Sequence, residues 1–214
     1  MSQVGYLRVQ LSPTGSVEDF DAWRLKTFQQ IPGTTQQKFL TATDDPDPAK
    51  PYRSEVVYDI EDITKLDLDK LLQEWSSPVA TITLVLYKRM DFAAHDGKEI
   101  PPEDGVIVAN SLTPENDPDV LEDYHAWYRD EHIHKLMQIP GWRTGSRYQL
   151  LDRRGECAEY VGPFMAVHQY DRENGLGGPE FLKSVLSDWT KKIDKRMAKR
   201  PHRRVFKIDR CTLY

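Results

Sequence analysis

The sequence predicts an α+β protein made of two tandem ferredoxin-like βαββαβ repeats. Two observations lead to this fold: short motifs occur twice along the chain, and predicted strands and helices follow the same order around each copy. The 214 residues suffice for one large domain or two small ones. With 39% hydrophobic and 29% charged residues, the composition is globular and excludes disordered, collagen-like and coiled-coil chains.

The repeat is clearest at a pair of tryptophans. Residues Glu18–Trp23 read Glu-Asp-Phe-Asp-Ala-Trp, residues Glu122–Trp127 read Glu-Asp-Tyr-His-Ala-Trp, and an Ile-Pro-Gly follows each segment. The offset between matching residues rises steadily from 101 to 114 along the chain. Short insertions in the second copy would produce such a rise, whereas chance matches would scatter.

Hydrophobic periodicity places the same elements in each copy. The first copy is expected to contain strand Val4–Leu11, helix Val17–Gln30, strands Thr34–Thr41 and Ser54–Asp59, helix Asp67–Trp75 and strand Thr81–Lys88. The second is expected to contain strand Val106–Leu112, helix Pro118–Gln138, strands Gly145–Leu151 and Phe164–Tyr170, helix Pro179–Met197 and strand Arg204–Cys211. Asp117 is the candidate N-cap before Pro118.

The expected domains are residues 1–98 and 105–214. The proline-rich loop His95–Asp104 is the expected linker, and Asp44–Pro51 is a second expected loop. One βαββαβ unit covers a single face of its sheet, so we expect the two sheets to pack face to face.

Charge and cysteine usage exclude several functions. The net charge of −5 disfavours a nucleic-acid partner, and no apolar run reaches the length of a membrane span. The N-terminus does not resemble a secretory signal, which predicts a cytoplasmic protein. Cys157 and Cys211 form no Cys-x-x-Cys pair, so a cysteine-bound zinc is excluded. The basic run Lys191–Arg204 is expected to be a solvated face.

The segment 121–142 carries the most chemistry. A helical wheel puts five of its residues on one stripe facing the sheet: Leu121, His125, Tyr128, His132 and Leu136. The wheel puts Trp127, Asp130 and His134 on the opposite side.

Two histidines and a phenol on one apolar stripe suit proton transfer near neutral pH. The alternative is a core histidine, His132, bonded to a neighbouring carbonyl, with Tyr128 as packing. The matching helix of the first copy contains no histidine, so any site belongs to the second copy. His132 is therefore the candidate acid–base group, with Tyr128 and His125 assisting it.

Two strands of the second copy offer candidate binding residues. Strand Phe164–Tyr170 alternates, so His168 and Tyr170 share a face, which meets either the helices or the centre of the barrel. Trp142 and Tyr148 share a face of the preceding strand and could form an aromatic wall.

Residues Tyr124–Ile133 followed by Ile139–Trp142 resemble the EthD-like branch of the dimeric α/β-barrel superfamily. That branch has a Trp-Tyr-x-x-Glu-His-x-Pro helix before a Pro-Gly turn, and here His134 replaces the proline. The duplicated frame is similar to fungal tandem versions, in which one chain forms the barrel as an internal pseudo-dimer. The resemblance implies His132 as the acid–base residue and a substrate cleft between sheet and helices.

The function expected from these patterns is that of a lyase or isomerase without a cofactor. Its reaction would be proton transfer, in the form of cyclisation, dehydration, decarboxylation or isomerisation, on a small hydrophobic, aromatic or polyketide-like metabolite of secondary metabolism. No metal, nucleic-acid or membrane partner is expected, and the chain would act as a monomer or a homodimer. Two alternatives remain. One is an oxygenase, either cofactor-free or haem-dependent with His168 or His132 as ligand; the other is a non-catalytic binding protein.

Overall fold

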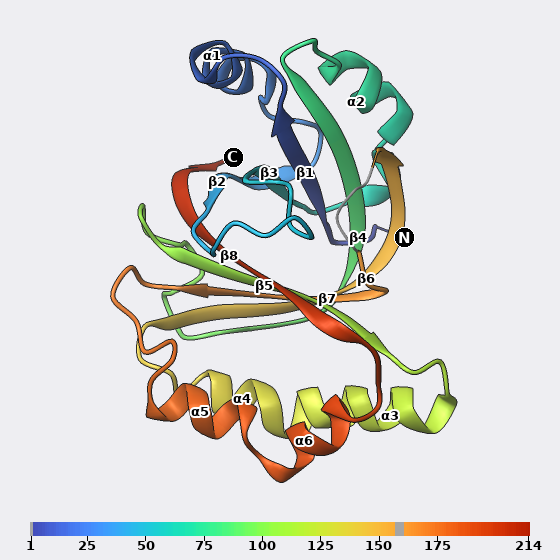
Figure 1. The fold of residues 1–214 in the computed structure, drawn as a ribbon, viewed down its shortest axis with the longest axis vertical. Coiled ribbons are helices and arrows are strands. Elements are labelled where there is room, and N and C mark those ends of the chain that lie inside the picture. The colour runs from blue at the N-terminus through green and yellow to red at the C-terminus, as the bar shows by residue number, and fades with distance from the viewer. Residues whose placement is uncertain (1, 157–160) are drawn as a thin grey trace. The chain divides into compact units, whose positions relative to one another are not determined.

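The computed structural model describes residues 2–156 and 161–214, so Cys157 lies outside the described residues (Figure 1). The described strands are antiparallel and hydrogen-bond in the order β1-β3-β2-β8-β5-β7-β6-β4, which closes into a barrel. Their bounds are β1 Gly5–Pro13, β2 Thr34–Ala42, β3 Ser54–Ile60, β4 Ala80–Ala94, β5 Val106–Pro114, β6 Trp142–Gly155, β7 Phe164–Tyr170 and β8 Met197–Leu213.

The helices lie between these strands so that the order β-α-β-β-α-β occurs twice. They are α1 Val17–Thr27, a 3-10 turn Ile63–Lys65, α2 Leu68–Trp75, α3 Pro118–Trp127, a π-helical turn Tyr128–His132, α4 Ile133–Leu136, α5 Pro179–Val185 and α6 Asp188–Asp194. Asp117 caps α3 by accepting from the amides of the next residues, as the sequence predicts. The α+β class and a barrel with helices are therefore confirmed. None of the helices in the described ranges combines the length and apolarity that a membrane crossing requires.

The described residues form two compact units. Unit 1 contains residues 2–90, 148–156 and 206–214, and unit 2 contains residues 91–147 and 161–205. These units do not coincide with the predicted repeats, because the ends of β6 and β8 belong to unit 1. The repeat boundaries stay a prediction from the sequence.

Unit 1 has a continuous apolar interior. Its helices α1 and α2 pack one large buried cluster against strands β1, β3 and β4. Trp75 of α2 is central, because its ring stacks on Tyr58 at 6.0 Å and meets Phe28 edge-on at 5.0 Å. The Tyr58 hydroxyl is satisfied by Gln37 at 3.0 Å. Burial of this cluster is the main stabilising contribution within unit 1.

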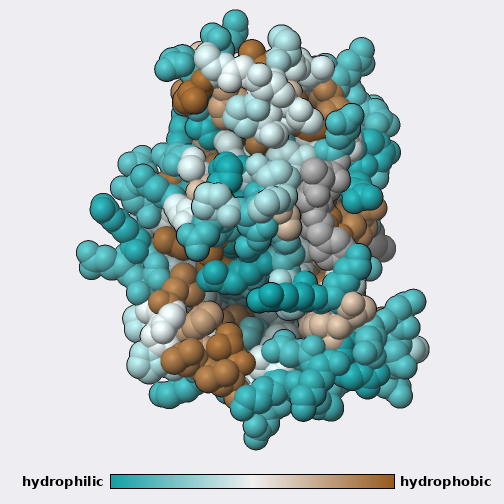
Figure 2. Space-filling model, in the orientation of Figure 1, coloured by the Kyte–Doolittle hydropathy of each residue, from teal (hydrophilic) through white to brown (hydrophobic). Residues whose placement is uncertain are grey.

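Unit 2 has a layer of helices, α3 to α6, along one face of its strands (Figure 1). Its apolar residues form two separate clusters, one around Trp127 and Ile193 and one around Leu136 and Trp142. On the face drawn in Figure 2, hydrophobic side chains gather over the region of α5, where Leu182 and Leu186 are exposed.

Three sequence expectations in unit 2 need correction. The predicted helix 179–197 is broken at Leu186–Ser187, because the Ser187 side chain caps a new helix by accepting from the Thr190 amide. The predicted helix 118–138 contains a π turn. Strand β8 begins at Met197, seven residues earlier than expected, so most of the basic run is strand rather than a helix end and loop. The two predicted loops are confirmed.

Candidate functional site

A cavity of about 480 Å³ opens in unit 2 between the helix layer and strands β5, β7 and β8. Its volume is within the range of small-molecule sites. Its walls combine apolar and polar side chains: Val108, Asn110, Leu112, Trp127, His132, Leu136, His168, Tyr170, Leu176, Phe181, Val185, Thr190, Asp194, Arg200, Pro201 and Arg203. The cavity thus combines a hydrophobic body with a small set of polar and ionisable side chains.

His132 enters this cavity from the π turn. Such turns insert a residue into a helix and are frequent at functional sites. Its ring stacks on Trp127 at 4.2 Å and meets Tyr128 edge-on at 5.4 Å. Burial lowers the pKa of His132 to about 3, and the nearby backbone carbonyl of Ser184 opposes this shift. The imidazole is therefore neutral at pH 7.

The break between α5 and α6 supplies that carbonyl. Ser184 lies in the last turn of α5, where backbone carbonyls lack an intrahelical partner. The Thr190 hydroxyl donates to it at 3.0 Å, and the Trp127 indole donates to Thr190 at 3.1 Å. Nδ1 of His132 is buried without a hydrogen-bond partner.

His168 on β7 has both ring nitrogens engaged. The indole of Trp142 donates to Nδ1 at 3.2 Å, and Nε2 lies 2.6 Å from the Tyr128 hydroxyl oxygen. An indole N–H can only donate, so Nδ1 must accept and the ring proton sits on Nε2. Nε2–H then donates to Tyr128. Burial lowers the pKa of His168 to about 3, so this neutral tautomer persists at pH 7.

Gly145 on β6 makes room for this imidazole. A Cβ atom at this position would lie 2.7 Å from Nδ1 of His168 and 3.1 Å from Ile133. Any side chain there would displace the ring.

Arg147 forms a separate polar centre under α3. It binds Asp91 through Nε at 2.8 Å, donates to Nδ1 of His125 at 3.3 Å, and lies 4.5 Å over the Tyr128 ring. Burial is the main cause that lowers the pKa of His125. Among the described residues, His125 does not belong to the cavity lining, and its ring lies against Phe164 at 5.1 Å.

The structure brings part of the predicted site together. His132, His168 and Tyr170 all line the cavity, so β7 turns this face toward the helices. Tyr128 and Trp142 lie behind His168 as its hydrogen-bond partners. Tyr128 and His132 touch through their rings at 5.4 Å, while the Tyr128 hydroxyl is hydrogen-bonded to His168.

The structure places Tyr148 and Trp127 elsewhere than the sequence predicted. Tyr148 belongs to unit 1, where it stacks on Tyr6 at 5.0 Å, so it does not form a wall with Trp142. Trp127, expected on the outer side of its helix, is only 4% exposed, because α6 packs over it. Asp130 and His134 are exposed, as predicted.

Sequence reasoning missed several lining residues. Asn110 carries a detectable signal, because it is the polar member of an otherwise apolar alternation along β5. The basic run was expected to be a solvated face, yet Arg204 is fully buried and Arg200 and Arg203 line the cavity. Among the described residues, no group of histidine, cysteine and acidic side chains is arranged to hold a metal ion.

Comparisons with known proteins show the fold. No family model and no curated protein matches the sequence. An anthrone oxidase-like protein superposes with a TM-score of 0.60 at 14% identity, over 98% of this chain and 93% of the other. A monooxygenase-like protein of Lactobacillus acidophilus superposes with a TM-score of 0.61 at 11% identity, over 99% of this chain and 96% of the other. A second monooxygenase-like protein, from Fusobacterium nucleatum, superposes with a TM-score of 0.59 at 11% identity, over 100% of this chain and 96% of the other. The chain thus shares the dimeric α/β-barrel type of fold with these proteins.

Proposed function

We propose that unit 2 is a catalytic unit that binds a small, hydrophobic, oxygen-bearing aromatic molecule and takes a proton from it. One observation carries this proposal: His132 lines a cavity of about 480 Å³, and its Nδ1 is buried without a hydrogen-bond partner. A buried polar atom left unpaired costs free energy, and ligand binding at a site can offset that cost. A core histidine bonded on both sides would have no such atom.

The geometry supports His132 as the base. As the imidazole of His132 takes a substrate proton, the nearby carbonyl of Ser184 stabilises the imidazolium, because a carbonyl favours the charged form. With a pKa of about 3 the free imidazole is a weak base. Negative charge that develops on a substrate beside it raises that pKa again, so proton transfer is tied to a bound, acidifying substrate.

His168, Tyr128 and Trp142 position the wall opposite this base. The two hydrogen bonds of His168 fix its ring and its tautomer, which keeps one flat, neutral surface at the cavity. Because Tyr128 accepts from His168, its own hydroxyl proton remains available for donation. His125 has no role in this scheme, since Arg147 engages it away from the lining.

Anthrone is a suitable first probe, because an anthrone oxidase-like protein shares the fold. Its methylene protons are acidified by the aromatic ketone. In deuterated buffer without oxygen, we expect the protein to catalyse exchange of these protons for deuterium, measured by NMR.

The His132→Ala variant should fold normally and lose on the order of 10²–10⁴ in exchange rate. The matched control is His134→Ala, on the exposed side of the same helix, which should exchange at the wild-type rate. Equal exchange by His132→Ala and the wild type would overturn the assignment of His132.

A second candidate function is oxygenation without a cofactor, favoured by the similarity in fold to the anthrone oxidase-like protein. The carbanion left by proton removal would pass electrons to O₂ and form a carbon–oxygen bond. Loss of water from the resulting hydroperoxide gives a carbonyl, so one CH₂ and one O₂ become one C=O and one H₂O. Oxygen uptake coupled to anthraquinone formation would distinguish this reaction from exchange alone, and binding without either would indicate a binding protein.

A haem-dependent route fits His168 poorly. Both of its ring nitrogens are engaged, by Trp142 and Tyr128, so iron ligation would break one of these bonds.

The EthD-like branch and the tandem origin of the two halves are part of the same proposal. They are supported by the twofold β-α-β-β-α-β order and by the paired tryptophan motifs. The duplication would leave one half, residues 105–214, with the proposed site.

A further inference from the structure

We propose that the cavity of unit 2 selects ligands with a negative charge at one end, an aromatic carboxylate above all, and that Arg200 and Arg203 of β8 bind the acidic group. This inference rests on the proposed function, because it concerns the same cavity. It names the class of substrate that the proposed base would act on.

The charges of the lining favour an anion. Two arginines face a single carboxylate, Asp194, and both histidines of the lining are neutral at pH 7. The formal charge of the lining is therefore +1, two positive charges less one negative. A buried charge on a ligand needs a partner of opposite sign, and here that partner is a guanidinium.

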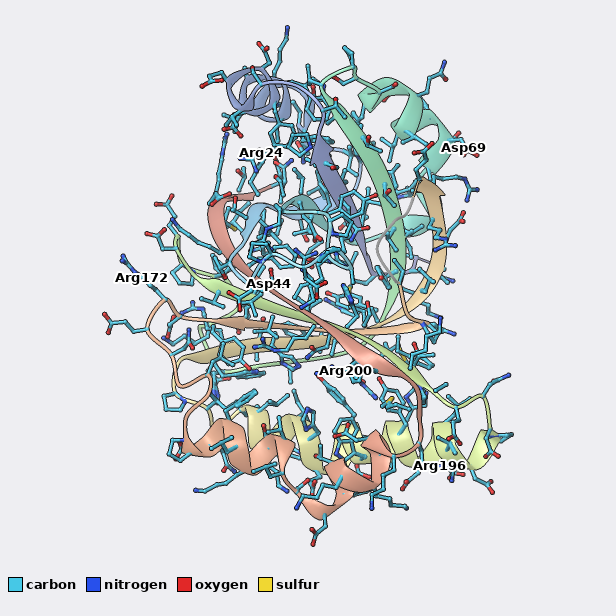
Figure 3. The ribbon with its side chains drawn as sticks, viewed as in Figure 1. Arg24, Asp44, Asp69, Arg172, Arg196 and Arg200 are labelled. Carbon is cyan, nitrogen blue, oxygen red and sulfur yellow. The ribbon has the colours of Figure 1, made fainter. Side chains whose placement is uncertain are left out.

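Arg200 keeps its donors for a ligand. Its side chain has no ion pair or hydrogen bond with another residue in the ranges 2–156 and 161–214. Arg196, four residues earlier, is instead bound to Glu115 at 2.8 Å. Figure 3 shows Arg196 near the start of β8 and Arg200 farther along the strand, beside the space between strands and helices. A planar guanidinium with free donors binds carboxylates in a bidentate manner.

Burial raises the pKa of the Asp194 carboxyl group, and no neighbouring cation opposes that shift. Arg203 lies beside Tyr170, where its charge lowers the pKa that burial of the phenol raises. The guanidinium of Arg200 is thus the group that is open to an acidic ligand.

The remaining walls fit a flat apolar body. Leu136, Leu176, Phe181 and Val185 line the cavity from the helix side and from the loop before α5. A ring system among these side chains, with its acidic group at β8, would satisfy both parts of the lining. The same ring would lie beside the imidazole of His132.

A matched pair of probes tests the inference: 2-naphthoate and 2-naphthamide, which have nearly the same shape and differ in charge. Affinities are measured by calorimetry at pH 7 for the wild type and for Arg200→Gln, Arg203→Gln and Arg196→Gln. The Val185→Trp variant places a large side chain in the cavity, so the binding that it retains measures the background from sites outside the cavity. We expect naphthoate to bind about tenfold or more tightly than naphthamide, because hydrogen bonds to charged groups exceed neutral ones by roughly this amount.

Arg200→Gln should remove most of that preference, and Arg196→Gln should retain it. Arg200 is exposed, so its variant should melt like the wild type, which keeps the test valid even where Arg203→Gln unfolds. Equal affinity of the wild type for the two probes overturns the inference and leaves the proposed function standing. Equal weakening by Arg200→Gln and Arg196→Gln also overturns it, since a general surface charge would explain that result.

Binding of neither probe above the Val185→Trp background overturns both the inference and the proposed function. The His132→Ala variant separates the two further. It should bind naphthoate as the wild type does, while losing the exchange of anthrone protons.

Discussion

The two units fill the space under their helices in opposite ways. In unit 1, Trp75 of the second helix lies over Tyr58 and Phe28 and completes a continuous core. In unit 2 the tryptophan that matches Trp75 in the repeat, Trp189, turns outward and donates to Asp123 at 3.1 Å. Unit 2 instead contains a cavity of about 480 Å³.

The strands differ at the corresponding place. Tyr58 lies opposite Leu7 in the β1–β3 pair, and His168 lies opposite Val108 in the β5–β7 pair. Leu7 and Val108 match in the repeat, at the offset of 101. In these strand pairs unit 1 places a satisfied phenol under a tryptophan, and unit 2 places a histidine at a cavity wall. The two units therefore differ in how the space under their helices is filled.

The largest expected effect is the loss of stability when the apolar interior of unit 1 loses Trp75. Trp75→Ala should lower the free energy of unfolding by about 3–5 kcal/mol, because it leaves a cavity in a closed core. Trp189→Ala, at a partly buried position, should cost only about 1–2 kcal/mol. Urea unfolding of both variants measures this difference. Equal losses would show that the two tryptophans are equivalent.

The second effect concerns pH. The folded-state pKa of His168 lies below its unfolded value, so below about pH 6.5 the unfolded chain binds a proton that the folded one does not. As the pH is lowered below 6.5, the free energy of unfolding should therefore decrease because of this residue. The decrease should be about 1.4 kcal/mol per pH unit, or about 2 kcal/mol between pH 6.5 and 5.

His168→Gln is the control for this titration. Its amide can accept from Trp142 and donate to Tyr128 but does not titrate in this range, so its stability should fall less steeply. Parallel curves for this variant and the wild type would contradict a depressed pKa.

A smaller effect is expected at Gly145. Gly145→Ala should destabilise unit 2 by about 1–3 kcal/mol through overpacking against His168. Gly15→Ala in unit 1 is the matched control, since its Cβ would meet only Val79 at an ordinary 3.7 Å. Melting curves and the NMR signals of the histidine ring report the two results. An unshifted His168 signal in Gly145→Ala would show that the ring tolerates a methyl group there.

The smallest effect compares two helix caps. Ser187→Ala and Ser16→Ala each remove an N-cap and should each cost about 1 kcal/mol. Only Ser187→Ala should also slow the proposed proton exchange, because Ser187 fixes the turn that presents Ser184 to His132. Equal exchange rates for both variants would separate the α5–α6 break from catalysis.

Much of the fold could be predicted, because its elements have strong periodicity. Strand Phe164–Tyr170 has the predicted bounds, and Asp117 caps the predicted helix. The break after α5 could not be predicted, because Leu186, Trp189 and Ile193 keep helical spacing across it. A hydrogen bond between distant groups, Thr190 to Ser184, accompanies the break, and spacing does not record such bonds.

The site was predictable only in part for the same reason. His132, His168 and Tyr170 stand out in an apolar pattern, and the structure places all three at the cavity. Trp142 and Gly145 gain their importance from contact with a residue on another strand, which sequence spacing does not reveal. Arg200 and Arg203 look like ordinary surface charges in a basic run.

The contact between His132 and the Ser184 carbonyl links the charge of the imidazole to a helix of the cavity wall. Ser184 lies in the last turn of α5, which carries Phe181 and Val185 into the cavity lining. In the proposed function, the interaction with this carbonyl would become charge-assisted and stronger when His132 takes a proton. The helix would then be held most tightly while the imidazole is charged, so that substrate retention would follow the same proton as the chemistry.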